Sequence, residues 1–228
     1  MRLNSLVLTL FLLQISGFSE LNAQIEVSDK DLQYYSALSK EIEIKNGDQF
    51  KKLVRKIEKL GKNDQERVIL AYTWIAQNIN YDVRAYLSKK YRPPYSKIVL
   101  NDKKAVCGGF ADLFNELCLA MNIESETVLG YAKGAGYSEN QKPLEHPNHA
   151  WNAVKINGKW QLIDSKWGSG YITKVKGKYQ YKRKFKKKYL FASPEMFLKT
   201  HLPEDVQWQL TKDKIDKAQF YSEQNVIR

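Results

Sequence analysis

Apolar residues recur at helical spacing in three segments of the chain. The spacing predicts a helix over residues 48–61, a second helix that Asp64 caps, and a third helix over residues 107–121. Between the second and third segments, Pro93-Pro94 interrupts the pattern. We therefore expect residues 84–104 to form a long connection.

Later in the chain the pattern changes to the alternation that is typical of β-strands. Residues 127–131 are strand-like, whereas residues 133–148, with two glycines and two prolines, are expected to form an exposed loop. Asn157-Gly158 separates two alternating runs and is a strong hairpin signal, and Gly177 indicates a second hairpin. Ser193-Pro194 indicates the start of a short helix. Helices followed by strands predict an α+β fold.

The first residues of the chain differ from the rest. A short basic start with Arg2 is followed by a mostly apolar run over residues 3–18 and a small residue, Ala23, at a plausible cleavage site. This is the layout of a secretory signal peptide, and the run is shorter than the ~20 residues of a membrane-spanning helix. The alternative is an uncleaved membrane anchor. We expect residues 1–23 to be removed and residues 24–228 to form one exported domain, periplasmic or secreted, without a transmembrane segment.

Composition and charge narrow the class of protein. With 43% apolar and 27% charged residues, the 228-residue chain has a globular composition, which argues against a disordered or fibrous protein. Two cysteines are too few for a disulfide scaffold. The net charge of +12 predicts attraction to anionic surfaces.

Much of the positive charge lies in one segment, Lys174 to Lys188. The simplest interpretation is a solvated hairpin whose lysines protect its edge against pairing. The functional interpretation is an anionic partner, which would be a lipid headgroup, an acidic polysaccharide or an acidic polypeptide. Nucleic acid is not expected as a partner of an exported protein. The basic residues of the segment are Lys174, Lys176, Lys178, Lys182, Arg183, Lys184, Lys186, Lys187 and Lys188.

Cys107 is a candidate nucleophile because it stands at the predicted start of the third helix, followed by Gly108 and Gly109. The free N–H groups and positive dipole end of a helix start stabilise a thiolate, which lowers a thiol pKa from about 8.5 to between roughly 3.5 and 7.5. The two glycines would let a substrate backbone approach the sulfur. Cys118 would lie roughly 16 Å along the same helix, too far for a disulfide. The alternative for Cys107 is a buried structural thiol.

The first predicted hairpin brings a histidine and an aspartate together. With a two-residue turn at Asn157-Gly158, His149 and Asp164 lie on one face of the two strands as diagonal neighbours. The same register places Lys166 opposite His149. Each residue alone also has a simpler interpretation, as a surface histidine and a turn-capping carboxylate.

Together these residues have the pattern of a nucleophile, a base and an orienting acid. His149 would take the proton of Cys107, and Asp164 would fix the tautomer of the imidazole. The Cys107 backbone N–H would donate to a developing oxyanion, and the second donor is not identified. A metal site of His146 and His149 with Cys107 or Asp164 has only the weak support of a His-x-x-His pair in a loop, so neither a metal nor a cofactor is expected.

Three segments resemble the core motifs of the transglutaminase-like superfamily, and most closely those of its kyphoscoliosis-peptidase-like branch. The resemblance covers about residues 68–210. It implies a papain-like α+β core in which a helix bearing Cys107 packs on an antiparallel sheet bearing His149 and Asp164. These three residues take the roles of nucleophile, base and orienting acid. The core motifs are Ala105–Phe114, His149–Val154 and Trp160–Trp167, with further similarity at Trp74–Asp82, Tyr189–Phe191, Ser193–Glu195, His201–Asp205 and Trp208–Leu210.

The resemblance also shapes the expected activity. It implies a cysteine-nucleophile acyl-transfer enzyme for amide bonds of proteins or peptides. Water as the acceptor gives a peptidase or amidase, which we favour, and an amine gives a transglutaminase. The alternative is a catalytically silent binding module that engages an anionic partner. No metal is implied, and no oxygen-rich calcium loop is found in the sequence. Lys166 replaces a common Thr, and it is expected to disfavour the charged imidazolium and shift the working pH upward.

Overall fold

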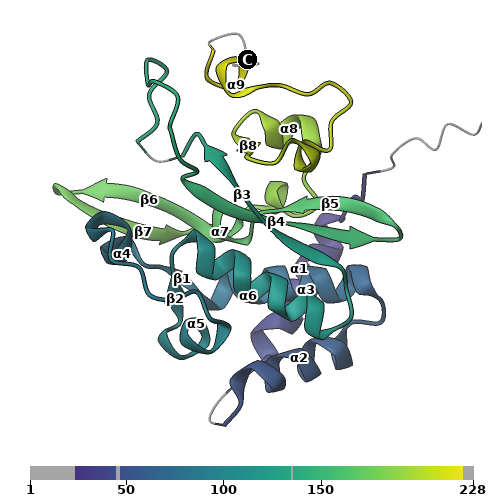
Figure 1. Cartoon of the computed structure of the whole chain (residues 1–228). Helices are drawn as coiled ribbons and strands as arrows, with labels where there is room; N and C mark the ends of the chain where they lie inside the picture. The colour runs from purple at the N-terminus through teal and green to yellow at the C-terminus, as the bar shows by residue number, and fades with distance from the viewer. Residues whose placement is uncertain (1–23, 45–46, 135, 223–228) are drawn as a thin grey trace, which may run out of the picture.

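The computed structural model describes residues 24–44, 47–134 and 136–222 (Figure 1). The predicted signal peptide, residues 1–23, lies outside these described residues and stays a prediction. In the described part of the chain, none of the helices has the length and apolar character that crossing a membrane requires.

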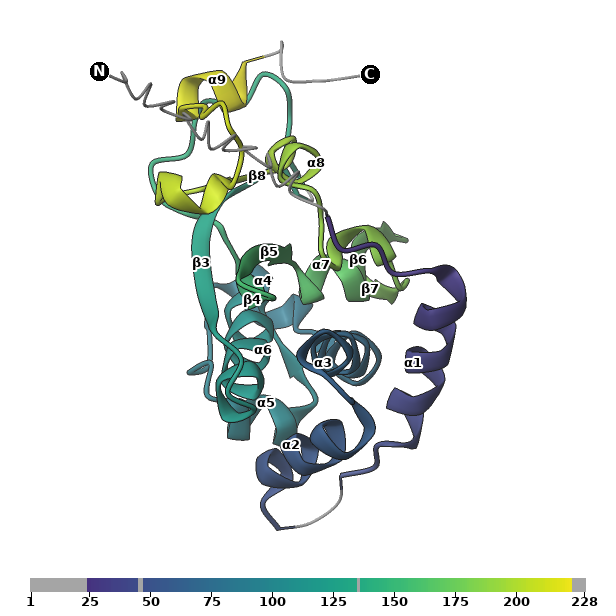
Figure 2. The same ribbon diagram turned by 90° about the vertical axis from the view of Figure 1, so that its right-hand side faces the viewer.

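Helices from the first half of the chain cover one side of a central sheet (Figures 1 and 2). Helix α3 lies at the centre of this layer, because its residues 68–76 are all buried. Two short strands pair in parallel beside it, β1 (Asn80–Tyr81) and β2 (Lys104–Ala105). The helices are α1 (Asp29–Glu41), α2 (Gln49–Leu60), α3 (Asp64–Asn78), α4 (Val83–Ser88), α5 (Ser96–Asp102) and α6 (Cys107–Ala120).

The three predicted helices are confirmed as α2, α3 and α6. The expected N-cap of α3 and the expected connection over residues 84–104 are wrong. Helix α2 begins after Asp48, whose side chain accepts the N–H of Lys51. Helix α3 begins at Asp64, but its cap is Asn63, and Asp64 lies in the first turn. The expected long connection over residues 84–104 instead contains most of α4 and all of α5. Both helices are too short, at six and seven residues, to show a helical period in the sequence.

The central sheet has four antiparallel strands in the order β5-β4-β3-β8. The predicted register of its hairpin is confirmed from the Ile156–Lys159 pair to the Asn152–Ile163 pair. Asn157 and Gly158 have φ values of 51° and 77°, which is why this sequence suits a tight turn with both central residues at positive φ. The strands are β3 (Ser125–Ala132), β4 (His149–Ile156), β5 (Lys159–Ile163) and β8 (His201–Pro203).

Strand β4 is buried on both faces, because cores lie on either side of the sheet. Val154 and Ile156 belong to the core shared with the helical layer. Trp151 and Ala153 belong to a second core, which also contains Phe197. Tyr189 of η1 (Lys187–Tyr189) belongs to this second core, and Trp208 of η2 (Val206–Gln209) packs against it. Helices α8 (Pro194–Leu198) and α9 (Lys217–Tyr221) lie on the same side (Figure 2).

The hairpin ends one residue before Asp164, which corrects the expected position of Lys166. Asp164 is the N-cap of α7 (Ser165–Ser169), and its Oδ1 accepts the Trp167 N–H at 2.7 Å. Lys166 therefore lies on a helix and not opposite His149 on a strand. The second predicted hairpin is confirmed as β6 (Gly170–Val175) and β7 (Lys178–Arg183), with Gly177 at a φ of 79°.

Candidate active site

Cys107 is the first residue of α6, and this helix packs against β3 and β4 (Figure 1). The N-cap residue, Val106, provides no side-chain hydrogen bond, so the first N–H groups of the helix have no side-chain cap. A Cβ at Gly108 would meet nothing within 4 Å, whereas a Cβ at Gly109 would lie 2.6 Å from the Cβ of Ala105. The expected space for a substrate is thus present at Gly108, and Gly109 is required for packing.

The structure brings together all three predicted site residues. His149 Nε2 lies 2.7 Å from Asp164 Oδ2, and the two residues are 7% and 1% exposed. The His149 side chain also interacts with the Cys107 thiol and lowers its pKa. Since Nε2 faces Asp164, Nδ1 is the nitrogen left for the thiol. The order of these interactions is therefore Cys107, His149, Asp164.

The surroundings of Cys107 and His149 favour their charged forms. Burial raises the pKa of Cys107, but the hydrogen bond and charge of His149 lead the opposing effects, so the pKa is lower than usual. Burial lowers the pKa of His149, but the effects of Asp164 and Cys107 outweigh it and raise that pKa to about 9. Both directions favour a thiolate beside an imidazolium, which is the reactive form of a cysteine nucleophile.

Lys166 acts on the site from α7 in a way that the sequence register did not predict. Its ammonium lies 4.6 Å from the centre of the Tyr81 ring. Its charge lowers the pKa of Cys107, so it stabilises the thiolate. Burial lowers the pKa of Lys166 itself, against the charges of Asp164 and Cys107. The expectation that it lies against the imidazolium of His149 is wrong, because α7 begins where the strand was expected to continue.

His201 is a buried member of the site that the sequence analysis did not assign. Its Nε2 lies 3.1 Å from Asp164 Oδ2, and its Nδ1 lies 2.8 Å from Thr200 Oγ1. Burial lowers the pKa of His201 to about 4, so the ring is neutral at neutral pH. One signal was available in the sequence, because His201 begins a segment that resembles the same family.

The same cluster of side chains must also be considered as a possible metal site. Among the described residues, His149, Asp164 and His201 offer potential ligand atoms within 4.8 Å of one another. His146, which the sequence suggested as a ligand, is exposed in the loop before β4 and is not a member of this group. Both histidines already use Nε2 to hydrogen-bond Asp164 Oδ2. A bound metal would have to replace those bonds, so the donor set fits a hydrogen-bond network better than a metal centre.

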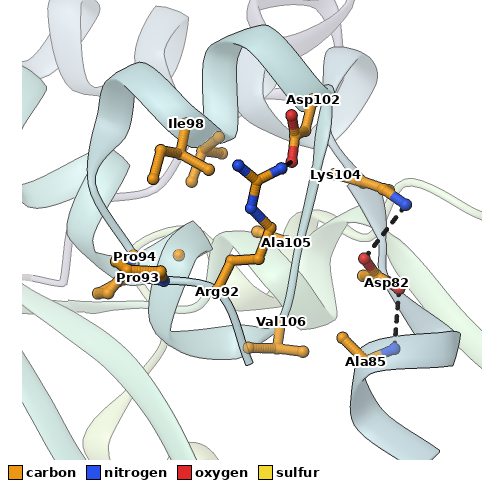
Figure 3. Close-up of a pocket in the computed structure, with 12 residues that line it drawn as sticks. Asp82, Ala85, Arg92, Pro93, Pro94, Ile98, Asp102, Lys104, Ala105 and Val106 are labelled. Carbon is orange, nitrogen blue, oxygen red and sulfur yellow. Dashed lines mark hydrogen bonds and ion pairs between the residues drawn. The ribbon is translucent and has the colours of Figure 1, made fainter. Parts of the chain in front are cut away.

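A pocket lies beside the first turn of α6 (Figure 3). Its charged side chains are paired with each other: Arg92 with Asp102, and Lys104 with Asp82 at 3.4 Å. The rest of its lining is mainly apolar and includes Pro93, Pro94, Ile98 and Val106. The pairing means that these four charges are already satisfied and do not mark an ion-binding site.

Comparisons with known proteins show which family this chain resembles. The family model of the transglutaminase-like superfamily matches residues 51–165. Kyphoscoliosis peptidase of Mus musculus is 33% identical over 193 residues, which is 83% of this chain and 29% of that protein. Hillarin of Drosophila melanogaster is 26% identical over 181 residues, or 75% of this chain and 22% of that protein.

The chain thus spans less than a third of the length of these curated relatives. Among solved structures, a crystal structure of a TGase aligns with a TM-score of 0.40 and 19% identity, covering 75% of this chain and 38% of the other.

Proposed function

Because this chain belongs to the transglutaminase-like superfamily, we propose that it is a cysteine-nucleophile acyl-transfer enzyme that acts on amide bonds of proteins or peptides. The observation that carries the proposal is the buried His149–Asp164 hydrogen bond beside half-buried Cys107, whose pKa His149 lowers. These three residues are its proposed nucleophile, base and orienting acid.

The proposed reaction has two steps that share one histidine. In the first step the Cys107 thiolate attacks the carbonyl carbon, and the oxyanion forms near the free N–H groups at the start of α6. The His149 imidazolium then gives its proton to the leaving amine, the C–N bond breaks, and a thioester remains on Cys107. In the second step neutral His149 takes a proton from the acceptor, which attacks the thioester carbon. The C–S bond then breaks, which restores the Cys107 thiolate and the His149 imidazolium. Asp164 keeps the imidazole in the required tautomer.

The acceptor decides between hydrolysis and amine transfer, and we propose hydrolysis. The two activities share every group named above, and water is the acceptor unless the site excludes it. Casein mixed with monodansylcadaverine separates them: a peptidase releases new N-termini, whereas a transglutaminase attaches the fluorescent amine to the protein.

The reactivity of Cys107 tests the proposal directly. We expect iodoacetamide to alkylate Cys107 rapidly well below pH 8, because His149 lowers the pKa of the thiol. In His149→Ala, burial is no longer opposed by the histidine, so the alkylation midpoint should move to higher pH. Peptide mass spectrometry measures both rates, with Cys118 as the internal control, since burial raises the pKa of Cys118. An ordinary thiol titration at Cys107 in both proteins would contradict the proposal.

A second proposed property is a surface for an anionic partner on the lysine-rich segment, Lys174 to Lys188. It is supported by the absence of any acidic residue in the sequence between Asp164 and Glu195. Some cations of the segment have structural contacts: Lys187 pairs with Asp29 and Arg183 hydrogen-bonds Asn80. Lys174, Lys186 and Lys188 lie over tyrosine rings. Besides Lys187 and Arg183, the exposed cations of the segment are Lys174, Lys176, Lys178, Lys182, Lys184 and Lys188. If catalysis were absent, this surface would carry the function as a binding module.

Charge reversal tests the surface separately from the chemistry. We expect Lys176→Glu, Lys178→Glu and Lys184→Glu together to reduce binding to polyglutamate, heparin or phosphatidylserine vesicles at least tenfold, while Cys107 alkylation is unchanged. The matched control reverses Lys30, Lys97 and Lys142, which are exposed elsewhere and give the same change in net charge. Equal loss in both triple variants would show that only net charge matters and would contradict a specific surface. The probe with the strongest binding would identify the partner class.

A further inference from the structure

Asp164 lies between two histidine rings, and only one of them contacts the nucleophile. Oδ2 of Asp164 is 2.7 Å from His149 Nε2 and 3.1 Å from His201 Nε2. We propose that His201 is a positioning residue, a neutral donor that holds the Asp164 carboxylate in place against His149. This inference rests on the proposed function, since it assigns a residue to the same reaction.

The hydrogen bonds determine the tautomer of His201. An ionised carboxylate only accepts, so Nε2 of His201 must carry the proton that it shares with Asp164. The ring is neutral, because burial holds its pKa near 4, so Nδ1 has no proton and accepts. The Thr200 hydroxyl, 2.8 Å from Nδ1, must then be the donor. Asp164 thus selects the tautomer in which Nε2 of His201 donates, and the Thr200 hydroxyl supports that tautomer as the donor to Nδ1.

The ring of His201 is held rigidly by its aromatic neighbours. It stacks on Phe197 with a centroid distance of 4.0 Å and an interplanar angle of 22°. Trp167 lies 4.3 Å from it, and Trp151 meets it edge-on at 5.2 Å. The side chain is 0% exposed. A ring so enclosed holds its Nε2 donor at a constant position, which is what orienting a carboxylate requires.

The carboxylate of Asp164 is therefore fixed at both oxygens. Oδ1 accepts the Trp167 N–H at 2.7 Å, and Oδ2 accepts from the two histidines. Without the donor of His201, the carboxylate is held by one imidazole and one backbone N–H only. Oδ2 would then accept a hydrogen bond from His149 alone. The stronger interaction would stabilise the imidazolium, so the pKa of His149 would rise.

A matched pair of substitutions separates the donor from the ring. His201→Phe keeps an aromatic ring but has no donor, whereas His201→Gln keeps an N–H donor at the distance of Nε2 but has no ring. We expect His201→Phe to lower kcat for p-nitrophenyl acetate by about 10- to 100-fold with KM nearly unchanged. The alkaline side of the pH profile of this variant should move to higher pH. His201→Gln should restore most of both properties, and Thr200→Val should have a weaker effect in the same direction as Phe.

A measurement that does not need turnover completes the test. NMR of ¹⁵N-labelled histidine reports the tautomer of His201 and the pKa of His149 in the wild type and each variant. The proposal expects a neutral ring protonated at Nε2, and a pKa of His149 that rises in His201→Phe and returns in His201→Gln. If these shifts occur in a protein without turnover, the positioning role holds and the proposed enzymatic function fails. A ring protonated at Nδ1, or equal behaviour of the Phe and Gln variants, would overturn the proposal.

Discussion

Replacing Cys107 with alanine is expected to lower turnover of p-nitrophenyl acetate by on the order of 10⁴-fold or more. The proposed reaction forms its covalent intermediate on this sulfur, so no remaining group can replace it. The free N–H groups at the start of α6 would still bind the oxyanion, and they set the residual activity. Stopped-flow absorbance should show a burst of one p-nitrophenolate per wild-type protein and none for the variant.

The matched control is Cys118→Ala on the same helix. Cys118 is 0% exposed and belongs to the core of the helical layer, so its loss affects packing and leaves the reaction unchanged. We expect its burst and turnover to stay within about twofold of wild type. Equal activity of wild type and Cys107→Ala would refute the enzymatic proposal. The lysine-rich segment would then be the remaining candidate for function.

Local sequence patterns predicted the part of the site that depends on short-range geometry. His149 and Asp164 are joined by a single hairpin with a two-residue turn, so the period of the strands was sufficient to place them on one face. Cys107 was predicted at a helix start because the apolar spacing of α6 begins there. The same reasoning was wrong for Lys166, since Asp164 caps a helix and ends the strand.

The rest of the site depends on long-range packing that no local pattern encodes. His201 follows Asp164 by 37 residues. It reaches Asp164 only because β8 pairs with β3, at the edge of the sheet opposite to β5. Helix α1 was not predicted, since only Leu32 and Ser39 are buried along its length and it has no clear apolar stripe.

Asp164→Asn is expected to lower turnover on the order of 10³-fold, even though asparagine is the orienting residue of papain-like enzymes. Asp164 accepts three hydrogen bonds, from the Trp167 N–H, His149 and His201. Asparagine has one accepting oxygen and a donating NH₂ group, so it must lose either the helix cap or the imidazole bonds. If the NH₂ group faces His149 Nε2, the imidazole adopts the tautomer protonated at Nδ1. That tautomer cannot take a proton from Cys107.

The pH dependence of Asp164→Asn distinguishes this loss from simple misfolding. Burial lowers the pKa of His149 and Asp164 raises it, so without the carboxylate that pKa falls and the alkaline limb of kcat/KM moves to lower pH. The imidazolium that lowers the pKa of Cys107 is then less populated, so the acid limb moves to higher pH. The bell-shaped pH profile of kcat/KM should therefore become narrower on both its acid and its alkaline side. Asp112→Asn, a control substitution on α6, should leave both sides of the profile unchanged.

The pH dependence of the free energy of unfolding tests the same substitution independently of activity. Burial raises the pKa of Asp164, but His149 and His201 outweigh it and hold the folded-state pKa well below its usual range. The carboxylate thus contributes stability that is present above about pH 4 and is lost as the pH falls through the folded-state pKa. The free energy of unfolding in urea should depend less on pH below about pH 4 in Asp164→Asn than in wild type. If Asp164→Asn had the turnover and the pH profile of kcat/KM of the wild type, and its free energy of unfolding fell equally at low pH, Asp164 would not orient His149.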